Sequence, residues 1–159
     1  MRSQQTGLTL IELTVTLAVM VTLVGTATPG FRSLLENNHL TAQANALHAD
    51  LLYARAEAVR RAATVRVVAR DGDWSQGWNV VNPNLAEDHP DRLIKAGSLS
   101  EYDLELTGAV TAVDYSGSGV LADLQPIDLT VCAASGQGRR IAIQGIGRVE
   151  VERISDCGN

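Results

Sequence analysis

The chain has 159 residues, which is enough for one modest domain and an appended helix. Its formal net charge is −5 and its isoelectric point is about 5.1, so a chain-wide basic surface for nucleic acid is excluded. Charged residues make up only 19%, because Glu12 is the only one between Leu8 and Pro29. Aromatic residues make up 4%, so the core must rest on aliphatic side chains.

An apolar run, Leu8–Thr28, follows a short polar leader. As a helix its 21 residues would be about 31 Å long, which matches the hydrocarbon core of a bilayer. Its threonines can bond back to a carbonyl one turn earlier, so their cost in lipid is modest. The run is too long for an ordinary secretory signal, and the small residue Gly7 precedes it. Because Arg2 and the α-amino group favour a cytoplasmic N-terminus, the rest of the chain is predicted to lie across the membrane.

Glu12 is a carboxylate inside the apolar run. At the bilayer centre such a group costs about 2.5–3.5 kcal/mol, and less near the end of the helix. One interpretation is a snorkelling or protonated glutamate in a plain anchor. The other is a partner: cleavage after Gly7 would leave an amino group on Leu8 that is positively charged near neutral pH. We favour the second, in which Glu12 of one subunit pairs with Leu8 of a neighbour in a bundle of parallel helices.

A second apolar pattern predicts that the helix continues to about Ala63, with a bend at Pro29-Gly30. Its apolar stripe recurs at steps of three and four residues: Leu40, Ala44, Leu47, Leu51, Ala54, Ala58 and Ala62. The opposite face is polar: Asn38, Gln43, Asn45, Asp50, Glu57 and Arg60. Arg60 and Arg61 suit a helix C-terminus, where cations meet the negative end of the dipole.

From Thr64 the pattern changes to period two and becomes rich in Val and Ile, which predicts strands. Seven are expected: Val65–Arg70, Gly77–Val81, Tyr102–Thr107, Ala109–Tyr115, Ile127–Ala133, Arg139–Gln144 and Arg148–Ile154. Pro83–Gly97 is expected to be a long polar loop. The fold class is therefore α+β, with one long helix that leads into a small antiparallel β domain.

The N-terminal residues Gly7-Leu8-Thr9-Leu10-Ile11-Glu12-Leu13 resemble the class III signal of type IV pilins and type II secretion pseudopilins. That signal reads G-F-T-L-I-E before an apolar run, and Leu8 here replaces the usual Phe. The resemblance implies cleavage by prepilin peptidase between Gly7 and Leu8 and N-methylation of Leu8. It also implies an assembly role for Glu12 and a helix break near Pro29.

Other segments are similar to the GspH/FimT family of minor pilins and pseudopilins. Tyr53–Arg61 resembles its AR-x-E-A-I-x-R stretch, and the segment from Trp74 to Trp78 resembles its W-x-x-G-W feature. The tail that holds Cys132, Gly147-Arg148-Val149 and Cys157 is also similar. The resemblance implies a type IV pilin-like fold in four parts: a leader (1–7), a transmembrane half-helix (8–29), an amphipathic half-helix (30–63) and a β-rich periplasmic domain (64–159).

The resemblance further implies a single-pass protein of the bacterial inner membrane that enters a filament and is not an enzyme. Its partners would be other minor and major pilins or pseudopilins, the prepilin peptidase and the inner-membrane assembly platform. It would act in filament initiation or capping. The sequence does not separate a type II secretion system from a type IV pilus. The cysteine pair and the tail favour the pilus, whereas the common label for the family is a secretion protein.

No catalytic residue, cofactor or metal site is predicted. His39 and His48 fall on opposite faces of the helix, so they cannot share a metal. His89 lies in an acidic stretch that could suggest a metal or acid–base pair, but a solvated loop is the better account. Asp71-Gly72-Asp73 lacks the later ligands of an EF-hand loop and is interpreted as a turn.

Two residue pairs each have two interpretations. Trp74 and Trp78 could form a recognition surface, but their spacing around a glycine turn favours core packing. Cys132 and Cys157 could be free buried thiols, but an oxidising periplasm favours a disulfide. That disulfide would close a loop of about 25 residues and add roughly 3–4 kcal/mol.

Four arginines near the C-terminus could contact DNA phosphates: Arg139, Arg140, Arg148 and Arg153. Some FimT-like pilins bind DNA through a tail motif G-R-x-R. Here Glu150 stands where the second arginine would be. On a strand, Arg148 would share a face with Glu150 and Glu152, which favours local ion pairs. DNA binding for natural transformation is therefore kept as the alternative function.

Overall fold

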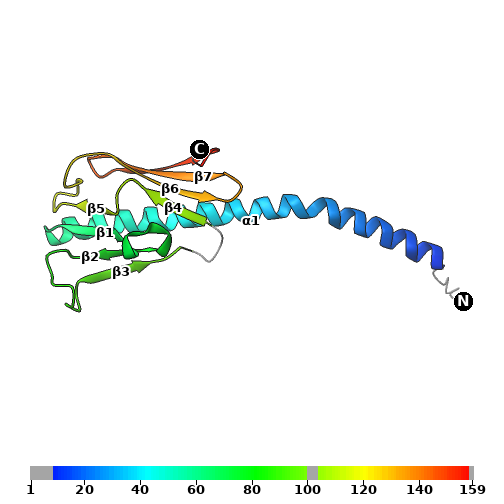
Figure 1. Cartoon of the computed structure of the whole chain (residues 1–159), viewed down its shortest axis with the longest axis horizontal. Helices are drawn as coiled ribbons and strands as arrows, with labels where there is room; N and C mark the ends of the chain where they lie inside the picture. Colours follow the sequence, from blue (N-terminus) through cyan, green and yellow to red (C-terminus); the bar gives the residue numbers. More distant parts are fainter. Residues whose placement is uncertain (1–8, 100–103, 158–159) are drawn as a thin grey trace, which may run out of the picture. The chain divides into compact units, whose positions relative to one another are not determined.

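The computed structural model describes residues 9–99 and 104–157, with the backbone alone for 26–29. The chain divides after Glu36 into two separate units. One helix, α1 (Leu10–Arg61), belongs to both, and all the strands belong to the second (Figure 1). The long N-terminal helix and the antiparallel β domain confirm the predicted fold class.

Helix α1 runs through Pro29 without interruption, so the break expected there is absent. A proline removes one backbone hydrogen bond and crowds the preceding turn, which can bend a helix without ending it. The helix ends two residues before the predicted Ala63, because Ala62 adopts a φ of +48°. The amides of Ala62 and Ala63 then donate back to the carbonyls of Val59 and Ala58, in the pattern of a Schellman cap.

The strands form two four-stranded antiparallel sheets. The first sheet has the order β3-β2-β1-β5, with bounds Leu93–Gly97, Trp78–Val81, Val65–Ala69 and Ala112–Tyr115. The second has the order β4-β6-β7-β8, with bounds Leu104–Gly108, Ile127–Ala133, Gly138–Ile143 and Val149–Ile154. Two 3₁₀ turns, η1 (Arg70–Gly72) and η2 (Trp74–Gln76), connect β1 to β2. Asp71-Gly72 therefore lies in a turn, as predicted.

Strand β3 corrects the expectation that Pro83–Gly97 is all loop. β3 pairs with β2 at the edge of the first sheet, and Leu93 remains half exposed. An edge strand with one partner and little burial carries no clear alternation of polar and apolar residues. The expected strand Ala109–Tyr115 is shortened to β5, and Tyr102 lies outside the described residues.

One core joins the second part of α1 to both sheets (Figure 1). Six residues of the predicted helical stripe are fully buried: Leu40, Ala44, Leu47, Leu51, Ala54 and Ala58. Ala62 is exposed, because the helix has already ended there. Trp74 and Trp78 are 3% and 1% exposed, which confirms their predicted place in the core.

Candidate assembly surface

The first part of α1 is apolar and unburied. Its most apolar window has a mean hydropathy of 2.0, and none of that window is buried within the protein. Among residues 9–99 and 104–157, α1 is the one helix long and apolar enough to cross a membrane. Its large exposed side chains are Leu10, Ile11, Leu13, Val15, Leu17, Val19, Met20, Val21, Leu23 and Val24. A helix that is apolar all round suits lipid or neighbouring helices rather than water.

Threonine hydroxyls in this part of α1 bond to the helix itself. The Thr14 hydroxyl donates to the Ile11 carbonyl at 2.9 Å, and the Thr22 hydroxyl donates to the Ala18 carbonyl at 2.7 Å. These bonds confirm the predicted back-bonding and leave little polar surface to desolvate in lipid.

Glu12 occupies the first turn of α1. Its backbone amide donates to the Thr9 hydroxyl at 3.3 Å, as in one half of a capping box. A negative side chain at this position also interacts favourably with the positive end of the helix dipole. Glu12 therefore suits the start of the helix within a single chain, a role that the sequence interpretation missed. Gly7 and Leu8, where cleavage and methylation are expected, lie outside the described residues.

The four arginines considered for DNA binding do not form one basic surface. Arg139 is buried, at 5% exposure. Arg140 pairs with Glu152 at 2.5 Å, which raises the pKa of Arg140, and Arg148 pairs with Glu150 at 2.6 Å. The predicted local ion pair of Arg148 is thus confirmed with Glu150, whereas Glu152 pairs with Arg140 on the neighbouring strand. Among the four, Arg153 combines an exposed side chain with the absence of an ion pair in the described residues.

Asp50 corrects the expectation that it lies on a solvated helix face, since it is 4% exposed. Its Oδ2 accepts a hydrogen bond from Trp78 Nε1 at 2.9 Å, and its Oδ1 pairs with Lys95. The Lys95 ammonium also lies 5.6 Å from the centre of the Tyr53 ring. Asp50 therefore ties α1 to β2 and β3 through the interior of the domain. This contact was not predicted, because strand β3, which carries Lys95, was expected to be loop.

Glu57, also expected on the polar face, is 8% exposed. Arg60 Nη2 and Arg61 Nε donate to its carboxylate at 2.6 and 2.7 Å. These hydrogen bonds hold the pKa of Glu57 at about 2, below its usual 4.5. Helical neighbours three and four residues away can reach one another, so this cluster stabilises the last turns of α1.

Arg55 connects α1 to two loops of the β domain. Its Nε donates to the Gly119 carbonyl at 2.7 Å, and its Nη2 donates to the Ile146 carbonyl at 3.1 Å. Gly147 has a φ of +80°, and a Cβ on it would lie 2.2 Å from the Gly119 oxygen. The family-like stretch Tyr53–Arg61 thus contributes Arg55 and Glu57 to contacts within the domain rather than to a chemical site.

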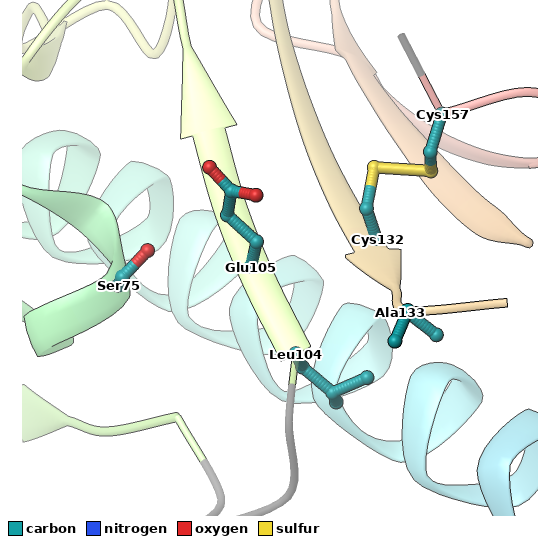
Figure 2. A pocket seen from close by; sticks show the side chains of 7 residues that line it. Ser75, Leu104, Glu105, Cys132, Ala133 and Cys157 are labelled. Atoms are coloured by element: carbon teal, nitrogen blue, oxygen red, sulfur yellow. A yellow bond between two sulfur atoms is a disulfide. The ribbon is translucent and has the colours of Figure 1, made fainter. Parts of the chain in front are cut away.

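Cys132 on β6 and Cys157 in the C-terminal segment form a disulfide, with Cα atoms 5.8 Å apart. A pocket of about 300 Å³ lies beside it, and Figure 2 shows Ser75, Glu105 and the disulfide at its walls. Glu105 is the register partner of Cys132 across β4 and β6. Both cysteines are bonded, so neither is a free nucleophile.

Metal-binding side chains are dispersed. In the described ranges, no group of three or more His, Cys, Asp or Glu residues is placed to hold a metal ion. His89 Nδ1 accepts a hydrogen bond from the Asp91 amide at 3.1 Å within its loop. This bond gives His89 a structural role in a turn.

Comparisons with known proteins match this arrangement. The model of a family described as "Type II transport protein GspH" matches residues 43–147. Two crystal forms of the type IV minor pilin FimU from Pseudomonas aeruginosa share the fold. The first has a TM-score of 0.65 at 24% identity, over 79% of this chain and 99% of FimU. The second has a TM-score of 0.62 at 24% identity, over 75% and 100%. No curated protein sequence matches.

Proposed function

Because the chain belongs to the GspH family, whose model matches about two thirds of it, we propose that it is a minor subunit of a bacterial filament. The filament is a type IV pilus or the pseudopilus of a type II secretion system, and the subunit acts in its initiation and assembly. The observation that carries the proposal is the apolar, unburied start of α1. The same helix continues into the β domain, whose hydrophobic core contains residues of α1 from Leu40 onward and none from the apolar start.

Before assembly, the apolar run is an inner-membrane anchor. Its 21 residues, Leu8–Thr28, are long enough for the hydrocarbon core of a bilayer. Arg2 holds the N-terminus in the cytoplasm, and the β domain then lies in the periplasm. The disulfide between Cys132 and Cys157 supports this placement, because disulfides persist in oxidising compartments.

During assembly, prepilin peptidase cleaves between Gly7 and Leu8, and the new Leu8 amine is methylated. The inner-membrane platform then moves the subunit into a filament, where the apolar part of α1 exchanges lipid for neighbouring helices. Glu12 of one subunit pairs with the Leu8 amine of the next, which compensates a carboxylate in an apolar environment. This role adds to the helix-start position that Glu12 has in the single chain.

The arginines support DNA binding for natural transformation less well than they support a role in filament assembly. Non-specific DNA affinity scales with the number of phosphates that free cations neutralise. Arg140 and Arg148 are engaged by glutamates, and Arg139 is buried. A role in filament assembly therefore accounts for the chain better.

The maturation step tests the proposal. Mass spectrometry of the chain isolated from cells should find a methylated N-terminus at Leu8, and the intact leader in cells that lack prepilin peptidase. A matched Gly7→Asp chain should keep its leader in both strains. An intact leader on the wild-type chain in peptidase-positive cells would contradict the proposed maturation.

A further inference from the structure

Two arginines stand opposite each other on neighbouring strands. Arg139 on β7 is the register partner of Arg153 on β8. Like charges in this position repel, and a sheet normally avoids them. The next register pair, Arg140 and Glu152, is instead an ion pair. In the β7–β8 register, Arg139 and Arg153 are therefore the pair that places like charges opposite each other.

Arg139 makes the imbalance costly because it is buried. Its Nη2 donates to Asn37 Oδ1 at 2.5 Å and to Thr41 Oγ1 at 3.0 Å, and its Nη1 donates to the Gly138 carbonyl at 2.9 Å. All three acceptors are neutral. Burial, with the nearby charge of Arg153, lowers the pKa of Arg139. Within the described residues, no carboxylate forms an ion pair with either arginine.

We propose that Arg139 and Arg153 receive a carboxylate from a neighbouring subunit of the filament. Arg153 is exposed and makes the contact. Arg139, its register partner on β7, adds a buried positive charge that Asn37 and Thr41 of α1 orient. The inference rests on the proposed function, because its partner is another subunit of the same filament.

The position of the pair suits a protein partner. β8 is the outer strand of the second sheet, so a neighbouring subunit can approach Arg153 from the side. A guanidinium fork matches the two oxygens of a carboxylate. A contact between different surfaces of successive subunits does not close on itself, which is the kind that builds an open filament. DNA fits less well, because of the four arginines only Arg153 is exposed without an ion pair in the described residues, and one cation neutralises few phosphates.

The chain's composition allows a direct test of contact. Lys95 is its only lysine, and Lys95 pairs with Asp50. A zero-length carbodiimide reagent joins an amine to a carboxylate that touches it. Full-length Arg153→Lys chains in cells with an intact filament system should therefore form a new cross-link to another filament subunit. Arg148→Lys, a matched change at an arginine already paired with Glu150, should form no such intersubunit cross-link.

Charge reversal tests whether the contact supports assembly. Arg153→Glu should lower the amount of chain in sheared filaments by about tenfold, the factor expected for one charge-assisted contact. Arg148→Glu should lower it by about twofold or less. Membrane levels of both variants should match those of the wild type. The unfolding midpoint should not fall for Arg153→Glu, because that change removes the like charge opposite Arg139.

Three results would overturn the inference: no intersubunit cross-link from Arg153→Lys, equal cross-links from Arg153→Lys and Arg148→Lys, or full incorporation of Arg153→Glu. An Arg153-dependent gel shift of a 30-base-pair duplex would assign the pair to nucleic acid and overturn it as well. Absence of the wild-type chain from filaments would contradict the proposed function itself. That result is told apart from failure of the arginine contact because it is seen without any variant.

Discussion

Removal of the buried Asp50 carboxylate should loosen the attachment of β2 and β3 to α1. Asp50→Ala removes the acceptor of the indole N–H of Trp78, a residue that is only 1% exposed. It also removes the counter-ion of Lys95. A hydrogen bond to a buried charged acceptor is worth about 1.5–3 kcal/mol. The pair with Lys95 adds less than about 1 kcal/mol, because that side chain is 48% exposed. The expected loss of unfolding free energy is therefore about 3 kcal/mol.

Urea unfolding of a soluble form, residues 30–159, measures this loss through tryptophan fluorescence. With a slope of about 2 kcal/mol per molar urea, the midpoint should fall by about 1.5 M. Asp50→Asn is the matched control, because it keeps an acceptor for Trp78 and loses only the charge pair, at about 1 kcal/mol.

A double-mutant cycle with Trp78→Phe isolates the hydrogen bond between Asp50 and Trp78, because the packing lost with the indole cancels in the coupling free energy. The coupling free energy between Asp50→Ala and Trp78→Phe should be at least about 1 kcal/mol. Equal effects of Asp50→Ala and Asp50→Asn, or a coupling energy near zero, would refute the assignment of Asp50 as the acceptor that joins the two elements.

Three further predictions concern the stability of the same domain. Replacing both cysteines by serine should cost about 3.5 kcal/mol for a separation of 25 residues, measured by urea unfolding, and a loss below about 1 kcal/mol would contradict it. Glu57 has a depressed pKa of about 2, so its contribution is complete above its ordinary pKa of 4.5 and is lost as the pH falls toward 2. Glu57→Gln should therefore cost about 1 kcal/mol at pH 7, and this cost should shrink as the pH falls through about 2; a pH-independent difference would count against the ion cluster. Gly147→Ala should lower stability by about 2–4 kcal/mol, because it adds a strained φ and a clash with the Gly119 carbonyl, whereas Gly136→Ala meets open space and should lose only about 1 kcal/mol.

The sequence was sufficient for features that depend on local pattern. The stripe from Leu40 to Ala58 predicted the buried face of α1, because helical periodicity reports burial directly. The glycine turn between Trp74 and Trp78 predicted their packing, and the alternation around Arg148 predicted its pairing with Glu150.

Features that depend on contacts between distant residues were not predicted. β3 escaped detection because an edge strand needs only one partner, and that partner is fixed by the fold rather than by residues nearby. The burial of Asp50 was not predicted for the same reason, since its partner Lys95 lies on β3. The division into two sheets depends on which strands pair, and alternation along each strand does not reveal its partner.

Incorporation of Glu12→Ala chains tests the central claim most directly. Full-length wild-type and variant chains are expressed in cells with an intact filament system, and the chain is quantified in membranes and in sheared filaments. The account predicts equal insertion into membranes, because the apolar run is intact, and a strong loss from filaments. Glu12→Asp, which keeps the charge, should restore part of the incorporation. Normal incorporation of Glu12→Ala would contradict the account of α1 as an assembly helix.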